Sequence, residues 1–330
     1  MLRCFYKGVL FIALAAMLVA CDGGTNSVIS KITGKQGEIL IISPLDIQRT
    51  ALRDSLDTIL RQEYPYIPQS EPRFTTIYVT AKAFGNVLKP FRNILMIHFN
   101  ADSITPSLHL EKDKWAKEQR ILSLYGTDQR TLAEFVGQNK ELILSLFEEF
   151  ERDRTQTVNA ALCDRTITDS IQSLFGVNLT VPQGYSLRRA ANNFRWYSIE
   201  TPDISQGLLI YKYKRLGSMP WLPDSVIAHR NAVTKEYVPG PNAGTYMKVS
   251  TVVPSEFSIL KKEQDTVCFV RGFWEVEGHA MGGAYVSYSH LTPNRDSVVV
   301  TDGYIYAPRF KKRDYVRALE ALLQSQFRAR

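Results

Sequence analysis

Two arginines of this chain have the chemistry best suited to holding an anion. Arg230 lies in a His-Arg-Asn triplet, and Arg271 opens the stretch Arg-Gly-Phe-Trp-Glu. A guanidinium can fork onto two oxygens of a carboxylate or a phosphate, so both arginines are candidate ligand-binding residues. The alternative, which we favour, is a structural ion pair with Glu236, Glu275 or Glu277.

An acid and histidine cluster follows the second arginine. Glu275 and Glu277 would share one face of a regular strand, and His279 lies two residues further on. With Arg271 nearby, this set could supply the acid and base of a hydrolase acting on glycan material. A lone histidine in a turn is more often only a polar turn residue.

The glycine pair Gly282-Gly283 either allows a close approach of two backbone segments or exposes backbone to a ligand, and we favour the close approach. Aromatic residues gather in the same half of the chain. They could line a groove for a glycan, or they could form the core and cover a sheet face, which we favour. These residues are Trp196, Trp221, Trp274, Tyr211, Tyr213, Tyr285 and Tyr288.

Signatures of the common enzyme classes are missing from the sequence. It has no Gly-x-Ser-x-Gly elbow, no His-Glu-x-x-His, no phosphate loop and no Cys-x-x-Cys. The five histidines show no pair at metal-ligand spacing. We therefore expect no metal site and no cofactor. Catalytic triads can assemble from distant residues, so the question of catalysis stays open, with a non-catalytic protein favoured.

The N-terminal residues have the order of a secretory signal. Arg3 and Lys7 precede the apolar run Val9–Ala20, which is too short to span a bilayer, and Cys21 follows small residues. The ending Leu-Val-Ala-Cys resembles the lipobox of bacterial lipoproteins. That resemblance implies cleavage before Cys21 and attachment of its acylated thiol to membrane lipid.

We therefore predict a signal peptide over residues 1–20 and a flexible tether over residues 21–30. The protein is expected in the cell envelope, anchored by lipid at the outer membrane, on its periplasmic or its surface side.

Composition indicates a globular protein with a substantial core. The 330 residues are 45% hydrophobic and 22% charged, with a mild net charge of +7. The basic clusters are short, so we expect no nucleic-acid partner. Cys163 and Cys268 could pair in an oxidising compartment, although two free, buried thiols are favoured.

Hydrophobic periodicity predicts an α+β fold with mostly antiparallel sheets flanked by helices. The pattern changes near residue 175, which predicts an α/β lobe over residues 31–175 and a strand-rich lobe with a closing helix over residues 176–330. Ser43-Pro44 is expected to start the first helix, and Thr131 with Glu134 to cap a long one that runs past Arg154. The expected strands cover residues 37–42, 74–80, 93–99, 121–125, 178–181, 195–200, 208–213, 246–253, 266–277, 284–291 and 297–306. Short echoes between the halves leave a weak internal duplication as a minor hypothesis.

Several uncommon stretches occur in a fixed order along the chain. They are Pro68-Gln69-Ser70-Glu71-Pro72, His229-Arg230-Asn231, Arg271-Gly272-Phe273-Trp274-Glu275 and Gly303-Tyr304-Ile305-Tyr306. Together they resemble a family of Bacteroidota lipoproteins of unknown function, from Gly37 to the closing helix. Where that family often reads Met-Gly-Gly-Pro-Phe, this chain has Met281-Gly282-Gly283-Ala284-Tyr285. The resemblance implies an envelope lipoprotein and transfers no catalytic residues.

These observations favour a lipid-anchored envelope module that binds a protein partner or a small envelope ligand. The alternative is a hydrolase acting on glycan or cell-wall material.

Overall fold

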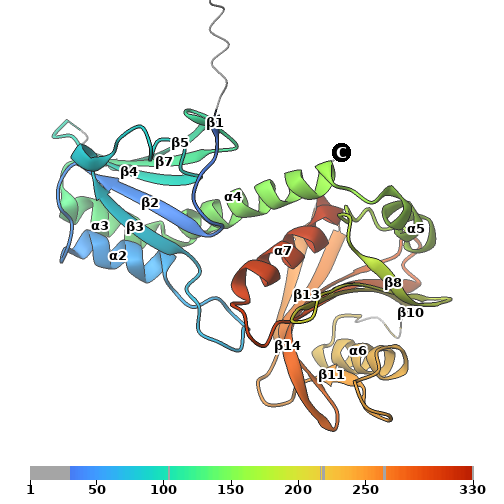
Figure 1. Ribbon diagram of the computed structural model, residues 1–330. Helices are drawn as coiled ribbons and strands as arrows, with labels where there is room; N and C mark the ends of the chain where they lie inside the picture. The colour runs from blue at the N-terminus through green and yellow to red at the C-terminus, as the bar shows by residue number, and fades with distance from the viewer. Residues whose placement is uncertain (1–29, 103–104, 216, 218–219, 263–264, 329–330) are drawn as a thin grey trace, which may run out of the picture.

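The chain forms an α+β fold of two lobes in the computed structural model, which describes residues 30–102, 105–215, 217, 220–262 and 265–328 (Figure 1). The fold class predicted from periodicity is confirmed. The predicted signal peptide, Cys21 and all but the last residue of the predicted tether lie outside the described residues. None of the described helices combines the length and apolar character needed to cross a membrane.

A five-stranded sheet in the order β3-β2-β4-β7-β5 forms the first lobe. Its strands are β2 (Glu38–Ser43), β3 (Thr75–Thr80), β4 (Asn93–Phe99), β5 (Ser107–Lys112) and β7 (Arg120–Gly126). All neighbouring strands are parallel except β5 and β7, so this sheet differs from the antiparallel expectation. Ile39 and Ile41 pack under the helices, and Leu40 and Ile42 pack on the other face. Burial on both faces explains the continuous apolar run of β2.

Three helices cover one face of this sheet: α2 (Ala51–Leu60), α3 (Gln129–Gln138) and α4 (Lys140–Ala161) (Figure 1). The prediction that Ser43-Pro44 starts the first helix is wrong, because Ser43 ends β2. Helix α2 instead begins after Thr50, whose Oγ1 accepts a hydrogen bond from the Arg53 N–H at 3.4 Å.

The single long helix predicted from Thr131 onward is two helices. Asp128 caps α3 by accepting a hydrogen bond from the Thr131 N–H at 2.8 Å, so the predicted capping box is wrong. Asn139 separates α3 from α4, and its Nδ2 donates to the Phe135 carbonyl at 2.8 Å. This side-chain bond satisfies a carbonyl at the end of α3.

An eight-stranded sheet forms the second lobe, and all its pairings are antiparallel. The strand order is β11-β13-β14-β15-β10-β9-β8, with β12 also paired to β13. The strands are β8 (Ser186–Ala191), β9 (Phe194–Glu200), β10 (Ser205–Lys214), β11 (Met247–Val249), β12 (Glu256–Lys262), β13 (Asp265–Val276), β14 (His279–Leu291) and β15 (Ser297–Tyr306).

Helices cover both faces of the larger sheet (Figure 1). On one face lie α5 (Arg165–Phe175) and α7 (Arg313–Gln324), and on the other lies α6 (Pro223–Tyr237). A sheet covered on both faces buries successive side chains of a strand on opposite sides, and β15 shows this. Val299 belongs to the core under α5 and α7, whereas Val298 and Val300 belong to the core under α6.

Two expected strands in this half differ from the structure. Residues 178–181 form no strand, although Leu179 and Val181 are buried in the core beside α5. The strand expected over residues 246–253 is confined to β11. The five-stranded sheet and the eight-stranded sheet share neither strand order nor strand direction, so the fold gives internal duplication no support. Cys163 is half-buried and Cys268 is buried, and both are free thiols.

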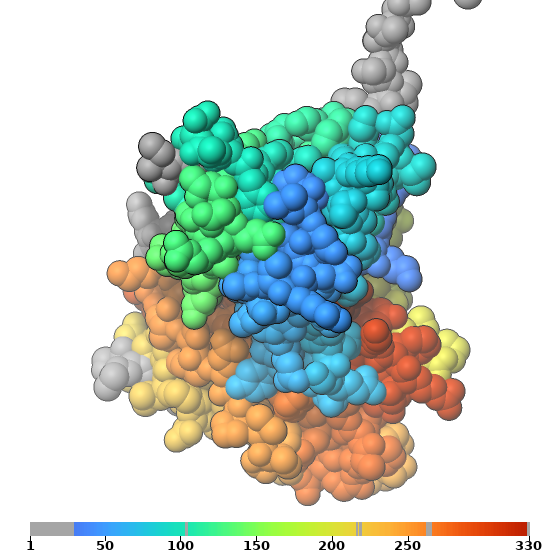
Figure 2. Space-filling view, turned by 90° about the vertical axis from the view of Figure 1, so that its left-hand side faces the viewer, coloured from blue at the N-terminus to red at the C-terminus, as the bar shows by residue number. Residues whose placement is uncertain are grey.

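The segment between α2 and β3, which contains the Pro-Gln-Ser-Glu-Pro stretch, contacts the second lobe through its polar side chains. The Glu71 carboxylate, 4% exposed, accepts hydrogen bonds from the backbone N–H groups of Lys312 and Arg313 where α7 begins. Gln69 accepts one from Lys312 Nζ at 2.7 Å. Figure 2 shows this segment in light blue against the orange surface of the second lobe. Helix α4 makes a further connection, since Gln156 Nε2 donates to the Ala321 carbonyl of α7 at 2.9 Å. The domain boundary near residue 175 stays a prediction.

Candidate functional site

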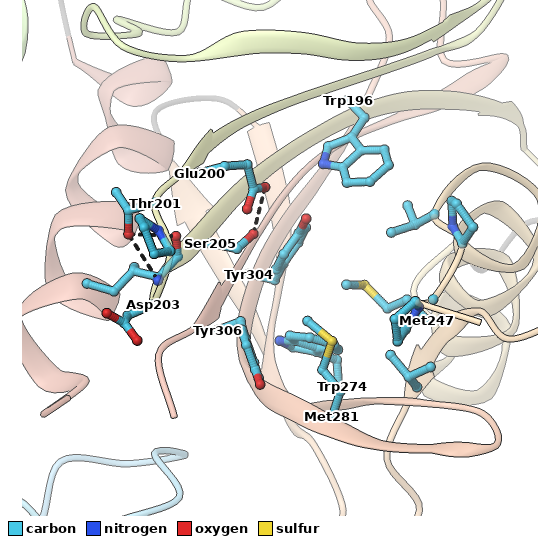
Figure 3. Close-up of a pocket in the computed structure, with 17 residues that line it drawn as sticks. Trp196, Glu200, Thr201, Asp203, Ser205, Met247, Trp274, Met281, Tyr304 and Tyr306 are labelled. Carbon is cyan, nitrogen blue, oxygen red and sulfur yellow. Dashed lines mark hydrogen bonds between the residues drawn. The ribbon is translucent and has the colours of Figure 1, made fainter. Parts of the chain in front are cut away.

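A cavity of about 350 Å³ opens at one end of the eight-stranded sheet, on the face that α6 covers (Figure 3). Strands β9, β13 and β15 end there, and β10, β11 and β14 begin there, so six strands contribute side chains to one place. The segment after α6, residues 238–241, forms the opposite side. The site is therefore assembled by long-range strand pairing.

Aromatic side chains form the walls of this cavity. They are Trp196, Trp274, Tyr304 and Tyr306, accompanied by Met247 and Met281. The ring of Trp274 lies 5.3 Å from that of Tyr304, tilted by 68°, and 6.3 Å from that of Tyr306. Trp274 is 2% exposed and its Nε1 donates to the Ile305 carbonyl at 3.3 Å, which fixes the indole. These contacts make the aromatic wall of the cavity rigid.

Glycines make room for these rings. A Cβ on Gly207 would lie 1.9 Å from the ring of Tyr304, the residue opposite it on β15. A Cβ on Gly283 would lie 2.0 Å from the Ile305 carbonyl oxygen and 3.1 Å from Trp274 Nε1. A Cβ on Gly282 would lie 2.6 Å from the Trp274 carbonyl oxygen. The glycine pair therefore serves the close approach that we favoured and lies beside the cavity instead of lining it.

Polar groups occupy one side of the cavity, where the turn between β9 and β10 closes it (Figure 3). Ser205 Oγ donates to Glu200 Oε1 at 2.9 Å, and the Tyr304 hydroxyl points toward the same side. Burial raises the pKa of Tyr304, and the Glu200 carboxylate adds to the shift, so the phenol keeps its proton. Asp203 lies further out and contacts Arg309 Nη1 at 3.5 Å.

The charged residues that line the cavity are all of one sign. Glu200 and Asp203 are acidic, and no lysine, arginine or histidine is among the described residues that line the cavity. The arrangement can therefore stack a flat ring between aromatic faces and accept hydrogen bonds from hydroxyl or ammonium groups at the Glu200 side. It offers no nucleophile paired with a histidine.

Arg230 lies outside this cavity, in the core behind it. It is 2% exposed and bidentate to Asp302, with Nε–Oδ2 at 2.8 Å and Nη2–Oδ1 at 3.1 Å. The Tyr285 ring lies 3.9 Å from the guanidinium. Burial lowers the pKa of Arg230, but Asp302 outweighs that effect and the net shift is upward. Arg230 thus forms the structural ion pair that we favoured, with an acid other than the three we named.

The other charged site residues predicted from the sequence are not among those that line the cavity. Arg271 pairs with Glu320 of α7, on the sheet face opposite the cavity. Glu275 and Glu277 both contact Lys248 Nζ, the former at 3.3 Å, and His279 is exposed at the start of β14. The structure therefore brings the two acids of the hydrolase hypothesis together around Lys248, whereas Arg271 is paired with Glu320. The described residues also contain no cluster of three or more His, Cys, Asp or Glu that could hold a metal ion.

Sequence reasoning favoured the core for the aromatic residues and missed the polar side of the cavity. Trp274, Tyr211, Tyr285 and Tyr288 are buried core residues, and Trp196 and Trp274 also line the cavity. The stretch Gly303-Tyr304-Ile305-Tyr306 contained a usable signal, because alternation places both tyrosines on one face. Glu200 carried no signal, since its position depends on the pairing of β9 with β10.

Comparison with known proteins supplies family matches without an assigned activity. Residues 164–325 match the family described as Domain of unknown function (DUF4837), and residues 32–160 match Domain of unknown function (DUF8532). The expectation of a family of unknown function is confirmed, and its placement among Bacteroidota lipoproteins stays a prediction. No curated protein matches the chain.

Similarity to solved structures is weak. The Saccharomyces cerevisiae Ran-binding protein Mog1p is 12% identical, with a TM-score of 0.32, and the match covers 46% of this chain and 89% of that one. The human StarD13 lipid transfer and protein localization domain is 10% identical, with a TM-score of 0.23, and the match covers 50% of this chain and 96% of that one. The function therefore has to be inferred from the site itself.

Proposed function

We propose that this chain is a non-catalytic binding module of the cell envelope, anchored through an acylated Cys21, whose aromatic cavity takes a small ring-bearing ligand. The observation that carries the proposal is the lining of the cavity, in which indole and phenol rings surround a space whose charged groups are all acidic. Ligand cavities in proteins are typically apolar with a few fixed polar groups, and this one fits that description.

The chemistry of the lining narrows the class of ligand. A sugar ring or an aromatic ring could stack on Trp196 or Tyr306, which line the cavity and are only half-buried. Glu200 and Asp203 would accept hydrogen bonds from hydroxyl groups or attract an ammonium group, and they would repel an anion. The ligand is therefore neutral or cationic. The envelope location is supported by the lipobox-like sequence before Cys21.

Tryptophan fluorescence of the full-length chain tests the proposal directly, with oligomers of N-acetylglucosamine and an aromatic amine such as tyramine as probes. We expect a saturable change for at least one probe. Trp196→Ala should weaken binding about tenfold, because a stacked ring contributes about 1 kcal/mol beyond its buried area. Glu200→Gln should weaken the amine more than the sugar, because it removes the charge at similar size.

The matched control is Trp115→Ala, which removes a half-buried tryptophan that packs on Phe84 in the other lobe. It should leave probe affinity unchanged. Affinities equal in the Trp196 variant and the wild type, or no saturable response to either probe, would contradict the proposal.

A further inference from the structure

A second cavity, of about 180 Å³, lies where the two lobes meet, and arginines gather around it. Helices α4 and α7, strand β13 and the segment before β3 all contribute to its lining, so both lobes supply its charges. The charged residues that line it are Arg73, Glu148, Arg152, Arg271, Arg317 and Glu320.

Positive charge exceeds negative charge in this cavity, because four guanidinium groups face two carboxylates. Each of the two carboxylates already contacts two partners within the protein. Glu148 Oε1 lies 3.3 Å from Arg73 Nη1 and 3.2 Å from Arg317 Nη2. Glu320 accepts hydrogen bonds from Arg271 and, at 3.0 Å, from the Tyr64 hydroxyl.

Several guanidinium N–H groups therefore lack an acceptor within the protein. The Nε atoms of Arg73, Arg271 and Arg317 are buried without a hydrogen-bond partner. Arg152 is half-buried and lines the cavity, and it forms no ion pair with a carboxylate of the described residues. The Tyr64 ring, 5.3 Å from the Arg317 guanidinium, compensates only in part through its π face. Buried charged donors without acceptors are costly, so the cavity is short of negative oxygen atoms.

We propose that this inter-lobe cavity binds a phosphate-type oxyanion. Guanidinium groups fork onto the oxygens of such an anion, and a dianion would match the excess of two positive charges. The cavity has the volume of about six water molecules, which is room for a phosphate group. Because its arginines come from both lobes, the bound anion would hold the lobes together. This site is separate from the acidic aromatic cavity, which would repel the same ligand.

Calorimetric titration of the full-length chain with inorganic phosphate, at constant ionic strength in chloride, tests the inference. We expect saturable binding and a thermal unfolding midpoint that rises by a few degrees once phosphate far exceeds its Kd. Arg152→Gln should weaken phosphate binding tenfold or more, because a hydrogen bond to a charged group is lost. This variant breaks no ion pair, and its far-ultraviolet circular dichroism should match that of the wild type.

The matched control is Arg165→Gln, which removes the same charge from an exposed position on α5. It should bind phosphate like the wild type. Glycerol phosphate in a parallel titration distinguishes the two sources of the anion. Similar affinity for both indicates a site for the phosphate group alone, and tighter binding of glycerol phosphate indicates a phosphorylated small molecule. No saturable binding of either, or equal binding by wild type and Arg152→Gln, would overturn the inference.

Discussion

Two arginines of this chain are neutralised by acids far away in sequence. Arg230 pairs with Asp302, and Arg271 pairs with Glu320. The acids next to Arg271 in sequence, Glu275 and Glu277, contact Lys248 instead. Residue type predicted ion pairs correctly, but the partners depend on strand register and on the position of α7. Those are tertiary features that local spacing does not contain.

Glu151 provides a test of such a buried charge through its pH dependence. Its side chain is fully buried and contacts Arg92 at 2.8 Å, Arg154 at 2.9 Å and Asn93 Nδ2 at 2.7 Å. Burial raises the pKa of Glu151, but the two arginines and the Asn93 hydrogen bond outweigh that effect. The net effect is to lower the pKa from its ordinary value of 4.5. The resulting stabilisation is fully present above the unfolded-state pKa and is lost as the pH falls through the folded-state pKa.

We therefore expect Glu151→Gln to lower the free energy of unfolding by about 3–5 kcal/mol at pH 7, because Arg154 would keep a buried charge without its acid. The difference between variant and wild type should shrink as the pH is lowered below about 4. Urea denaturation at pH 7 and at pH 3 measures both effects. Glu149→Gln, an exposed position on the same helix, is the control and should cost little. A difference that does not change with pH would contradict this account.

At the scale of elements, continuous apolar runs were predicted well and exposed edge strands were not. The predicted strands over residues 93–99 and 297–306 coincide with β4 and β15, because both consist mainly of buried side chains. Strand β8, Ser-Leu-Arg-Arg-Ala-Ala, is almost fully exposed and exists through its pairing with β9, so it carried no hydrophobic pattern. The run at residues 178–181 had the pattern of a strand but lies outside both sheets.

The glycines of the large sheet give an element-scale prediction. Gly207→Ala should lower the free energy of unfolding by about 1–3 kcal/mol, because its Cβ would overlap the Tyr304 ring and push it toward the aromatic cavity. Probe binding there should weaken as well. Thermal unfolding and the fluorescence titration measure the two effects.

Gly137→Ala is the control for Gly207→Ala. Gly137 lies within α3, and a Cβ there would meet open space. Alanine at that position should raise the free energy of unfolding by about 0.5–1 kcal/mol, through its higher helix propensity. Equal effects of the two substitutions would show that the Tyr304 ring does not require a glycine opposite it.

At the scale of the whole molecule, the two cavities differ in charge and in position. The aromatic cavity lies within the second lobe and is acidic, whereas the arginine-lined cavity lies between the lobes. The sequence predicted two lobes from a change in periodicity, but it did not predict how they meet. That contact depends on two hydrogen bonds to α7. Glu71 accepts one from the Lys312 N–H, 241 residues away, and Gln156 donates one to the Ala321 carbonyl, 165 residues away.

The proposed envelope location of the molecule depends on acylation of the Cys21 thiol. Acyl chains stabilise membrane attachment by about 0.8 kcal/mol for each buried CH₂, so two or three chains would make it effectively permanent. We expect the wild type in the membrane fraction, with a mass that shows removal of residues 1–20 and addition of acyl chains. Cys21→Ser should lose the acyl chains and the cleavage before residue 21.

The control is Cys163→Ser, which removes a free, half-buried thiol and should leave fractionation and mass processing unchanged. A Cys21→Ser protein that fractionates like the wild type, with the same N-terminal mass, would contradict lipid anchoring. The phosphate and fluorescence titrations would keep their meaning in that case, because both cavities are lined by residues 64–324 of the folded lobes.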